Sequence, residues 1–123
     1  MIRLAKNYEK EPLFLKTIAE QEEISQGYLE QILPMLKNAK LITSSRGANG
    51  GYSLTKLPQK ITLKNIIEAL EGPVKITECV DNPKTCCKHK KCPSRKIWCK
   101  LKKTITKTLE ETTLKDLVDN HQY

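Results

Sequence analysis

The feature that most constrains the fold is a glycine-rich turn, with three glycines in the six residues Arg46–Gly51. Glycine adopts the positive φ angles that a tight reversal of the chain needs, so this segment predicts a hairpin turn. Two short segments that read as strands flank it, Leu41–Ser45 before the turn and Gly51–Leu54 after it. We therefore expect one small antiparallel hairpin in a chain whose other apolar patterns have the helical period.

Two short amphipathic segments precede the hairpin and are predicted to be helices. In Leu13–Glu22 the apolar residues recur at helical spacing, and Thr17 is the expected cap. Ser25 is a good N-cap for a second helix that runs to about Ala39, with an expected bend at Pro34. Two short helices joined by a tight turn are typical of a helix-turn-helix, and the hairpin would be its wing.

Further helices are predicted after the hairpin. Thr62–Leu70 carries an apolar stripe and is closed by Gly72 and Pro73. A longer helix begins near Pro93, and its apolar stripe continues into a short last helix. The long stripe consists of Ile97, Trp98, Leu101, Ile105 and Leu109. The expected fold is mainly α with a small β-hairpin wing: a winged helix-turn-helix plus a long C-terminal helix.

Charge and composition narrow the class of partner. The 123 residues include 22 Lys+Arg against 14 Asp+Glu, a net charge of +8, which favours a polyanionic partner through counterion release. No stretch approaches the ~20 apolar residues that span a bilayer, and the N-terminus lacks the apolar core of a signal peptide. We therefore expect a cytoplasmic protein with no membrane partner. No Ser/His/Asp or Cys/His constellation is visible, so an enzyme is not expected.

The cysteines are concentrated in one segment. All five lie within 21 consecutive residues, and the stretch Lys84–Lys103 adds nine Lys/Arg without one acidic residue. In a reducing cytosol such clusters indicate metal binding or redox sensing more often than disulfides. Thiolates are the soft ligands of iron–sulfur clusters. A zinc site, a metal-free thiol switch and inert cysteines are the alternatives.

Several segments taken in order resemble a known family. They are Ile24–Gln31, Arg46–Tyr52, Ala69–Pro73, the spaced cysteines and Thr112–Leu117. Together they are similar to the Rrf-type family of bacterial winged-helix transcription regulators, which includes the IscR, NsrR and CymR types. The resemblance covers essentially the whole chain from Lys6 onward.

The resemblance implies a homodimer that binds double-stranded DNA. One helix of each subunit would enter a major groove, the wing would reach the minor groove, and the long C-terminal helix would pair the subunits. It divides the chain into a DNA-binding winged helix-turn-helix (1–75), a cysteine-bearing sensor loop (76–92), and a dimerisation helix with a C-terminal tail (93–123).

The family register also nominates DNA-contacting residues. They are Ser25, Gln26, Tyr28, Glu30, Gln31, Arg46, Gly47 and Asn49. Glutamine can pair with adenine and glutamate can accept a hydrogen bond from cytosine N4. Arginine is attracted to the negative potential of a narrow minor groove. The alternatives are an ordinary solvated helix face and a simple hairpin turn.

Three of the cysteines match the family's cluster-binding loop. Cys79, Cys86 and Cys92 have the spacing C-x6-C-x5-C, which implies a [2Fe–2S] or [4Fe–4S] cluster whose state sets DNA affinity. Cys87 directly follows Cys86 and is expected to be a bystander. Cys99 is a weaker candidate for a fourth ligand.

The chain departs from the family pattern in two places. Family members usually carry further helical residues before the position of Met1, and in some members that segment supplies the fourth ligand from the partner subunit. Arg95 stands where IscR-type proteins have a ligating histidine, and an arginine stays protonated and cannot ligate iron. Two other functions are therefore kept open. One is a metal-free, CymR-like regulator that responds to a partner protein or to thiol oxidation. The other is a small iron–sulfur electron carrier, which leaves 13–55 unexplained.

Overall fold

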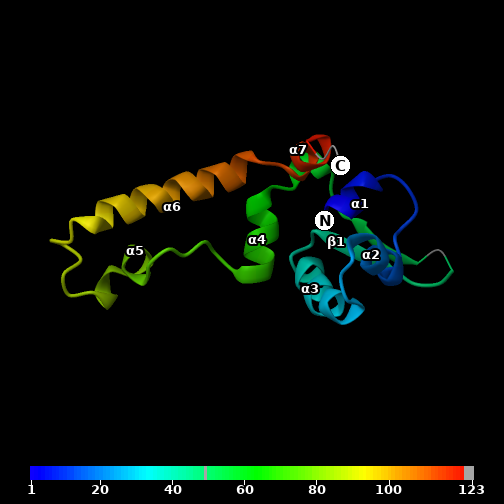
Figure 1. Ribbon diagram of the computed structural model, residues 1–123, viewed down its shortest axis with the longest axis horizontal. Coiled ribbons are helices and arrows are strands. Elements are labelled where there is room, and N and C mark those ends of the chain that lie inside the picture. Colours follow the sequence, from blue (N-terminus) through cyan, green and yellow to red (C-terminus); the bar gives the residue numbers. More distant parts are fainter. Residues whose placement is uncertain (49, 121–123) are drawn as a thin grey trace.

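The computed structural model describes residues 1–48 and 50–120, and it has an elongated shape (Figure 1). Its elements are α1 (Ile2–Lys6), α2 (Leu15–Glu22), α3 (Gln26–Asn38), β1 (Ile42–Ser45), β2 (Gly51–Leu54), η1 (Pro58–Lys60), α4 (Leu63–Glu71), α5 (Glu78–Asp81), η2 (Pro83–Thr85), α6 (Ser94–Glu111) and α7 (Leu114–Asp119). The expected mainly helical fold with one two-stranded antiparallel hairpin is confirmed. No helix in the described part of the chain is long and apolar enough to cross a membrane.

The molecule consists of a head and an arm. The head contains α1, α2, α3, the hairpin and α7, and the arm contains α5, η2 and α6, with α4 between them (Figure 1). The hydrophobic core lies in the head, where Ile42, Ile61 and Leu114 are fully buried. The short terminal helix α7 therefore returns to the head after the arm has extended away from it.

The helix-turn-helix is formed by α2 and α3. As predicted, Ser25 caps α3, because its Oγ accepts a hydrogen bond from the backbone N–H of Tyr28 at 3.2 Å. The expected cap at Thr17 is wrong: α2 already begins at Leu15, after Phe14 in extended backbone. The helix α3 also continues through Pro34, because the buried stripe of Leu29, Leu33 and Leu36 holds both of its halves against the core.

The hairpin pairs β1 with β2, from Ile42 opposite Leu54 to Ser45 opposite Gly51. The segment before α2 joins this sheet by an isolated bridge, in which Leu13 and Tyr52 exchange backbone hydrogen bonds of 3.0 and 2.8 Å. Gly51 has φ +130°, and a Cβ there would lie 2.5 Å from the carbonyl oxygen of Leu13. Only glycine therefore allows this close approach.

Two sets of contacts attach the near end of the arm to the head (Figure 1). On one side α4 packs against α3 and α6. On the other, residues 61–63 and 112–114 run antiparallel, with hydrogen bonds from Leu63 N to Thr112 O at 2.9 Å and from Leu114 N to Ile61 O at 2.8 Å. We call this contact the clip.

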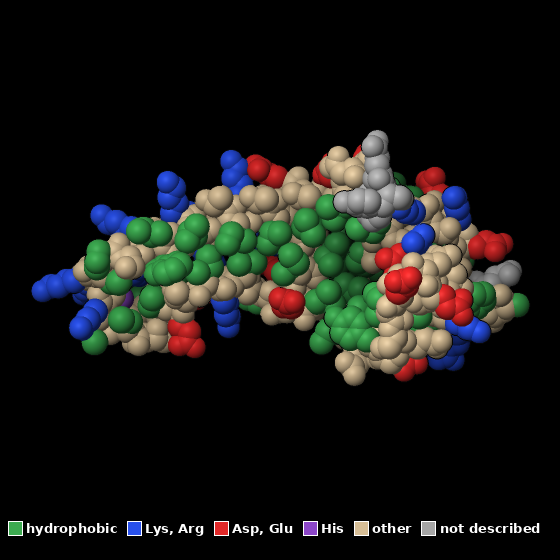
Figure 2. Space-filling view, viewed as in Figure 1, with side chains coloured by type: hydrophobic (Ala, Val, Ile, Leu, Met, Phe, Trp, Pro, Cys, Tyr) green, Lys and Arg blue, Asp and Glu red, His purple; other side chains and the backbone are tan. Residues whose placement is uncertain are grey.

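The predicted stripe of α6 is largely exposed in the single chain. Ile97, Trp98, Leu101 and Ile105 are 61%, 38%, 42% and 41% exposed. Figure 2 shows hydrophobic side chains gathered along the arm, with lysines and arginines projecting around them. Large apolar side chains in a continuous exposed row are typical of an interaction surface.

Candidate nucleic-acid interface and cysteine loop

The first turns of α3 present polar side chains to solvent. Gln26, Tyr28, Glu30 and Gln31 are all exposed, whereas Leu29 of the same helix is buried in the core. The sequence-predicted residues of this helix are therefore all accessible, and the packing of Leu29 against the core fixes how the helix sits on the head. Ser25 is also exposed, but its side chain is engaged as the helix cap.

The tip of the hairpin carries the other predicted residues. Arg46 and Gly47 are exposed, and Gly47 has φ +97°. Asn49 lies outside the described residues. Gly50 donates a backbone hydrogen bond to Gly47 O at 3.0 Å, and a Cβ at Gly50 would lie 2.7 Å from Ser45 O. The turn is therefore tightly closed, with Arg46 at its edge.

One positioning residue was missed by the sequence reasoning. The Nζ of Lys37, near the end of α3, donates a hydrogen bond to Ser44 Oγ on β1 at 2.6 Å. This contact joins the helix to the hairpin. No local pattern predicted it, because it depends on how α3 packs against β1.

The cysteine loop is not a preassembled metal cage. Cys79, Cys86, Cys92 and Cys99 are half-buried and Cys87 is exposed. Within residues 1–48 and 50–120, no group of three or more Cys, His, Asp or Glu side chains could hold one metal ion. The three predicted ligands thus share one loop, and their thiolates have the right chemistry for a cluster. The described conformation does not bring them together.

Polar contacts hold this loop against α6 instead. Arg95 Nε donates to the carbonyl oxygen of Cys79 at 3.4 Å, and Lys102 forms an ion pair with Asp81. Arg95, the residue that departs from the family's cluster-binding pattern, therefore contacts the backbone of a predicted ligand. The loop also contains the short helical segments α5 and η2, which the sequence analysis did not predict.

Charged groups border the clip between arm and head. Lys64 on α4 forms an ion pair with Glu110 on α6 at 2.5 Å, and this hydrogen bond raises the pKa of Lys64. In α7, the hydroxyl and the backbone N–H of Thr113 both donate to the Asp116 carboxylate, at 2.6 and 2.8 Å. These two hydrogen bonds lower the pKa of Asp116. Both contacts are local supports for the point where the arm joins the head.

Comparison with known proteins gives one consistent result. A family model described as "Rrf2: Iron-dependent Transcriptional regulator" matches residues 1–120. The HTH-type transcriptional regulator CymR of Bacillus subtilis is 38% identical over 117 residues, which cover 95% of this chain and 80% of that protein. The solved structure of B. subtilis CymR, described as the global cysteine regulator, has a TM-score of 0.77 and covers 96% of this chain and 86% of its own. The structure of T. potens IscR has a TM-score of 0.79 at 34% identity, and covers 98% of this chain and 79% of its own.

Proposed function

The chain belongs to the Rrf2 family of transcriptional regulators, as its motifs predicted, and from this premise we propose that it reads DNA with α3 and the hairpin. Members of this family bind DNA and are regulators rather than enzymes. The observation that carries the proposal is the set of exposed polar side chains at the start of α3, together with the exposed Arg46 in the turn of the hairpin. We place its action in the cytoplasm, where the DNA of bacteria lies.

The two surfaces would contribute in different ways. Gln26, Glu30 and Gln31 carry the donors and acceptors that distinguish base edges in a major groove. Tyr28 is about half exposed and can contact phosphates or thymine methyl groups. Arg46 is suited to the minor groove, because it is an exposed arginine in the turn of the wing, and a narrow groove attracts its positive charge. The contact between Lys37 and Ser44 would keep the two surfaces in a fixed relation.

The experiment compares Arg46→Ala and Glu30→Ala on a duplex selected from a random library by the wild-type protein. Arg46→Ala should weaken binding to specific and random duplexes alike, while Glu30→Ala should relax base preference at one position of each half-site, by about 1–3 kcal/mol. Lys16→Ala is the matched control, because Lys16 is an exposed cation paired with Glu20 on α2. Fluorescence anisotropy measures all three. Equal losses by the Glu30 variant on specific and random duplexes would contradict base readout.

The long helix α6 is proposed to pair two copies of the chain. Its exposed stripe would be covered by the same stripe of a second subunit, and burial of apolar surface contributes ~25 cal/mol per Å². We assign DNA binding to residues 1–75, sensing to 76–92 and pairing to 93–123, where α7 packs back onto the head.

We further propose that the cysteine loop controls DNA affinity through an iron–sulfur cluster on Cys79, Cys86 and Cys92. When bound, such a cluster supplies a site sensitive to oxidation and to loss of iron. To bind a cluster, the chain would have to bring the three cysteine thiolates together, and this requires the loop to leave its present conformation. The contact between Arg95 and the Cys79 carbonyl holds the loop on α6 and would have to break in this movement.

Anaerobic reconstitution with iron and sulfide tests this proposal. Visible absorption and bound iron should be lost in Cys79→Ala, Cys86→Ala and Cys92→Ala but kept in Cys87→Ala, the matched control with an exposed thiol. DNA affinity should differ between loaded and metal-free protein. A protein that stays colourless and binds DNA equally with and without iron would contradict the cluster and favour the metal-free thiol route.

A further inference from the structure

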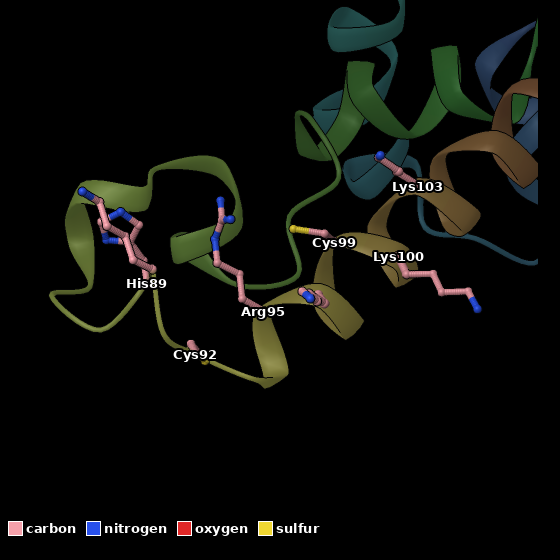
Figure 3. Close-up of a pocket in the computed structure, with 8 residues that line it drawn as sticks. His89, Cys92, Arg95, Cys99, Lys100 and Lys103 are labelled. Atoms are coloured by element: carbon pink, nitrogen blue, oxygen red, sulfur yellow. The ribbon is translucent and has the colours of Figure 1, made fainter.

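A cavity of about 420 Å³ lies between the cysteine loop and the first turns of α6 (Figure 3). It is lined by His89, Lys90, Cys92, Arg95, Lys96, Cys99, Lys100 and Lys103. His89, Lys90 and Cys92 belong to the loop, and the other residues belong to α6. Its volume is within the range of about 300–1,000 Å³ that is typical of small-molecule sites.

The charge of this cavity is entirely of one sign. Five of its eight lining residues are Lys or Arg, and none is acidic. Asp81, an acidic residue of α5, is engaged by Lys102, which does not line the cavity. Among these five cations of the described chain, only Arg95 uses its side chain in a hydrogen bond within the protein, and that bond goes to a neutral carbonyl.

Like charges around one hollow repel each other and destabilise the conformation that gathers them. A counter-ion with several negative charges removes this cost, and walls of one sign raise its local concentration. Arginine binds planar oxyanions through two parallel hydrogen bonds, and lysines add point charges. A hollow of this size accommodates a small molecule, and it opens to solvent, because four of its five cations are exposed.

We propose that this cavity binds a small multivalent oxyanion, of the phosphate or polycarboxylate class. The ligand contacts the loop through Lys90 and α6 through Arg95 and Lys103, so it joins the two segments. It draws Arg95 away from the Cys79 carbonyl, and it occupies space beside Cys92. The proposal rests on the cavity and its charge in the metal-free chain, and it does not require that the loop ever carries a cluster.

Isothermal titration of the metal-free full chain with pyrophosphate and with citrate, at constant ionic strength set by chloride, tests this site. Saturable binding of one anion per protomer is expected. The anion that binds more tightly shows whether the site prefers a phosphate or a polycarboxylate. Arg95→Gln combined with Lys103→Gln should weaken this binding tenfold or more, equal to about 1.4 kcal/mol. The control pair, Lys107→Gln with Lys115→Gln, removes the same charge outside the cavity and should leave binding unchanged.

Circular dichroism first confirms that both double variants are folded. Absence of saturable binding for both anions would overturn the proposal. Equal weakening of anion binding in the two double variants would also overturn it, because it would indicate a general attraction to the positive charge of the protein. Complete displacement of the anion by duplex DNA would also overturn it, because the cations would then belong to a DNA surface. Binding that persists with duplex present and in Arg46→Ala supports the site independently of the proposed DNA-binding function.

Discussion

Replacing Leu114 with alanine should be among the most damaging single changes in the chain. Leu114 is 0% exposed, belongs to the core of the head, and lies at the clip, where its backbone N–H donates to Ile61 O at 2.8 Å. The deleted methyl and methylene groups contribute about 0.8 kcal/mol each by burial alone. Because the clip holds the surrounding backbone in place, the cavity should not collapse, and the total should reach about 3–5 kcal/mol.

Urea unfolding followed by circular dichroism measures this loss. Wild type and variants are compared at one protomer concentration, because the stability of an oligomer depends on concentration. Leu117→Ala is the matched control, since Leu117 is on the same helix and packs on the same core but is only half-buried. A loss below about 1 kcal/mol for Leu114→Ala, or a loss no larger than that of the control, would refute the reasoning that α7 completes the core of the head.

Four further changes test other parts of the molecule. Leu101→Glu places a charge in the exposed stripe and should give monomers in sedimentation at micromolar concentration; a persisting dimer would place pairing elsewhere. Gly51→Ala should lower the melting temperature through a loss of about 1–3 kcal/mol, because its φ is +130° and its Cβ would meet Leu13 O. Gly27→Ala, in a helix with open space around it, should be neutral or stabilising. Asp116 has a folded-state pKa below its ordinary 3.8, so its contribution is present above that pH and lost as the pH falls further. The difference in unfolding free energy between wild type and Asp116→Asn should therefore be largest at neutral pH and shrink in acid.

Features that depend on neighbouring residues were predictable from the sequence. Ser25 could be recognised as a cap because a cap needs only its own side chain and the next backbone N–H groups. The turn containing Gly47 and Gly51 was predictable for the same reason, because it depends only on glycines within the turn itself. Thr17 failed as a cap because the bridge between Leu13 and Tyr52 fixes where the chain leaves the sheet, and α2 begins directly after it.

Features that depend on distant segments were not predictable in this way. The stripe of Leu114 was visible, but its burial in the head depends on a contact with residues 61–63. The positive charge of the cysteine segment was also visible. That Arg95 and Lys103 line one cavity with Cys92 follows from how the loop folds back on α6. The composition of the segment does not specify this arrangement.

The clip has a consequence for the order in which the protein is made. Residues 62–113 leave the ribosome between Ile61 and its core neighbour Leu114. At ~5–20 residues per second, this interval lasts roughly several seconds. During that time the apolar site that Leu114 fills in the finished head is open to water, beside strands with unpaired edges. The helix-turn-helix is thus synthesised well before Leu114, and it reaches its full stability only after Leu114 has joined the core.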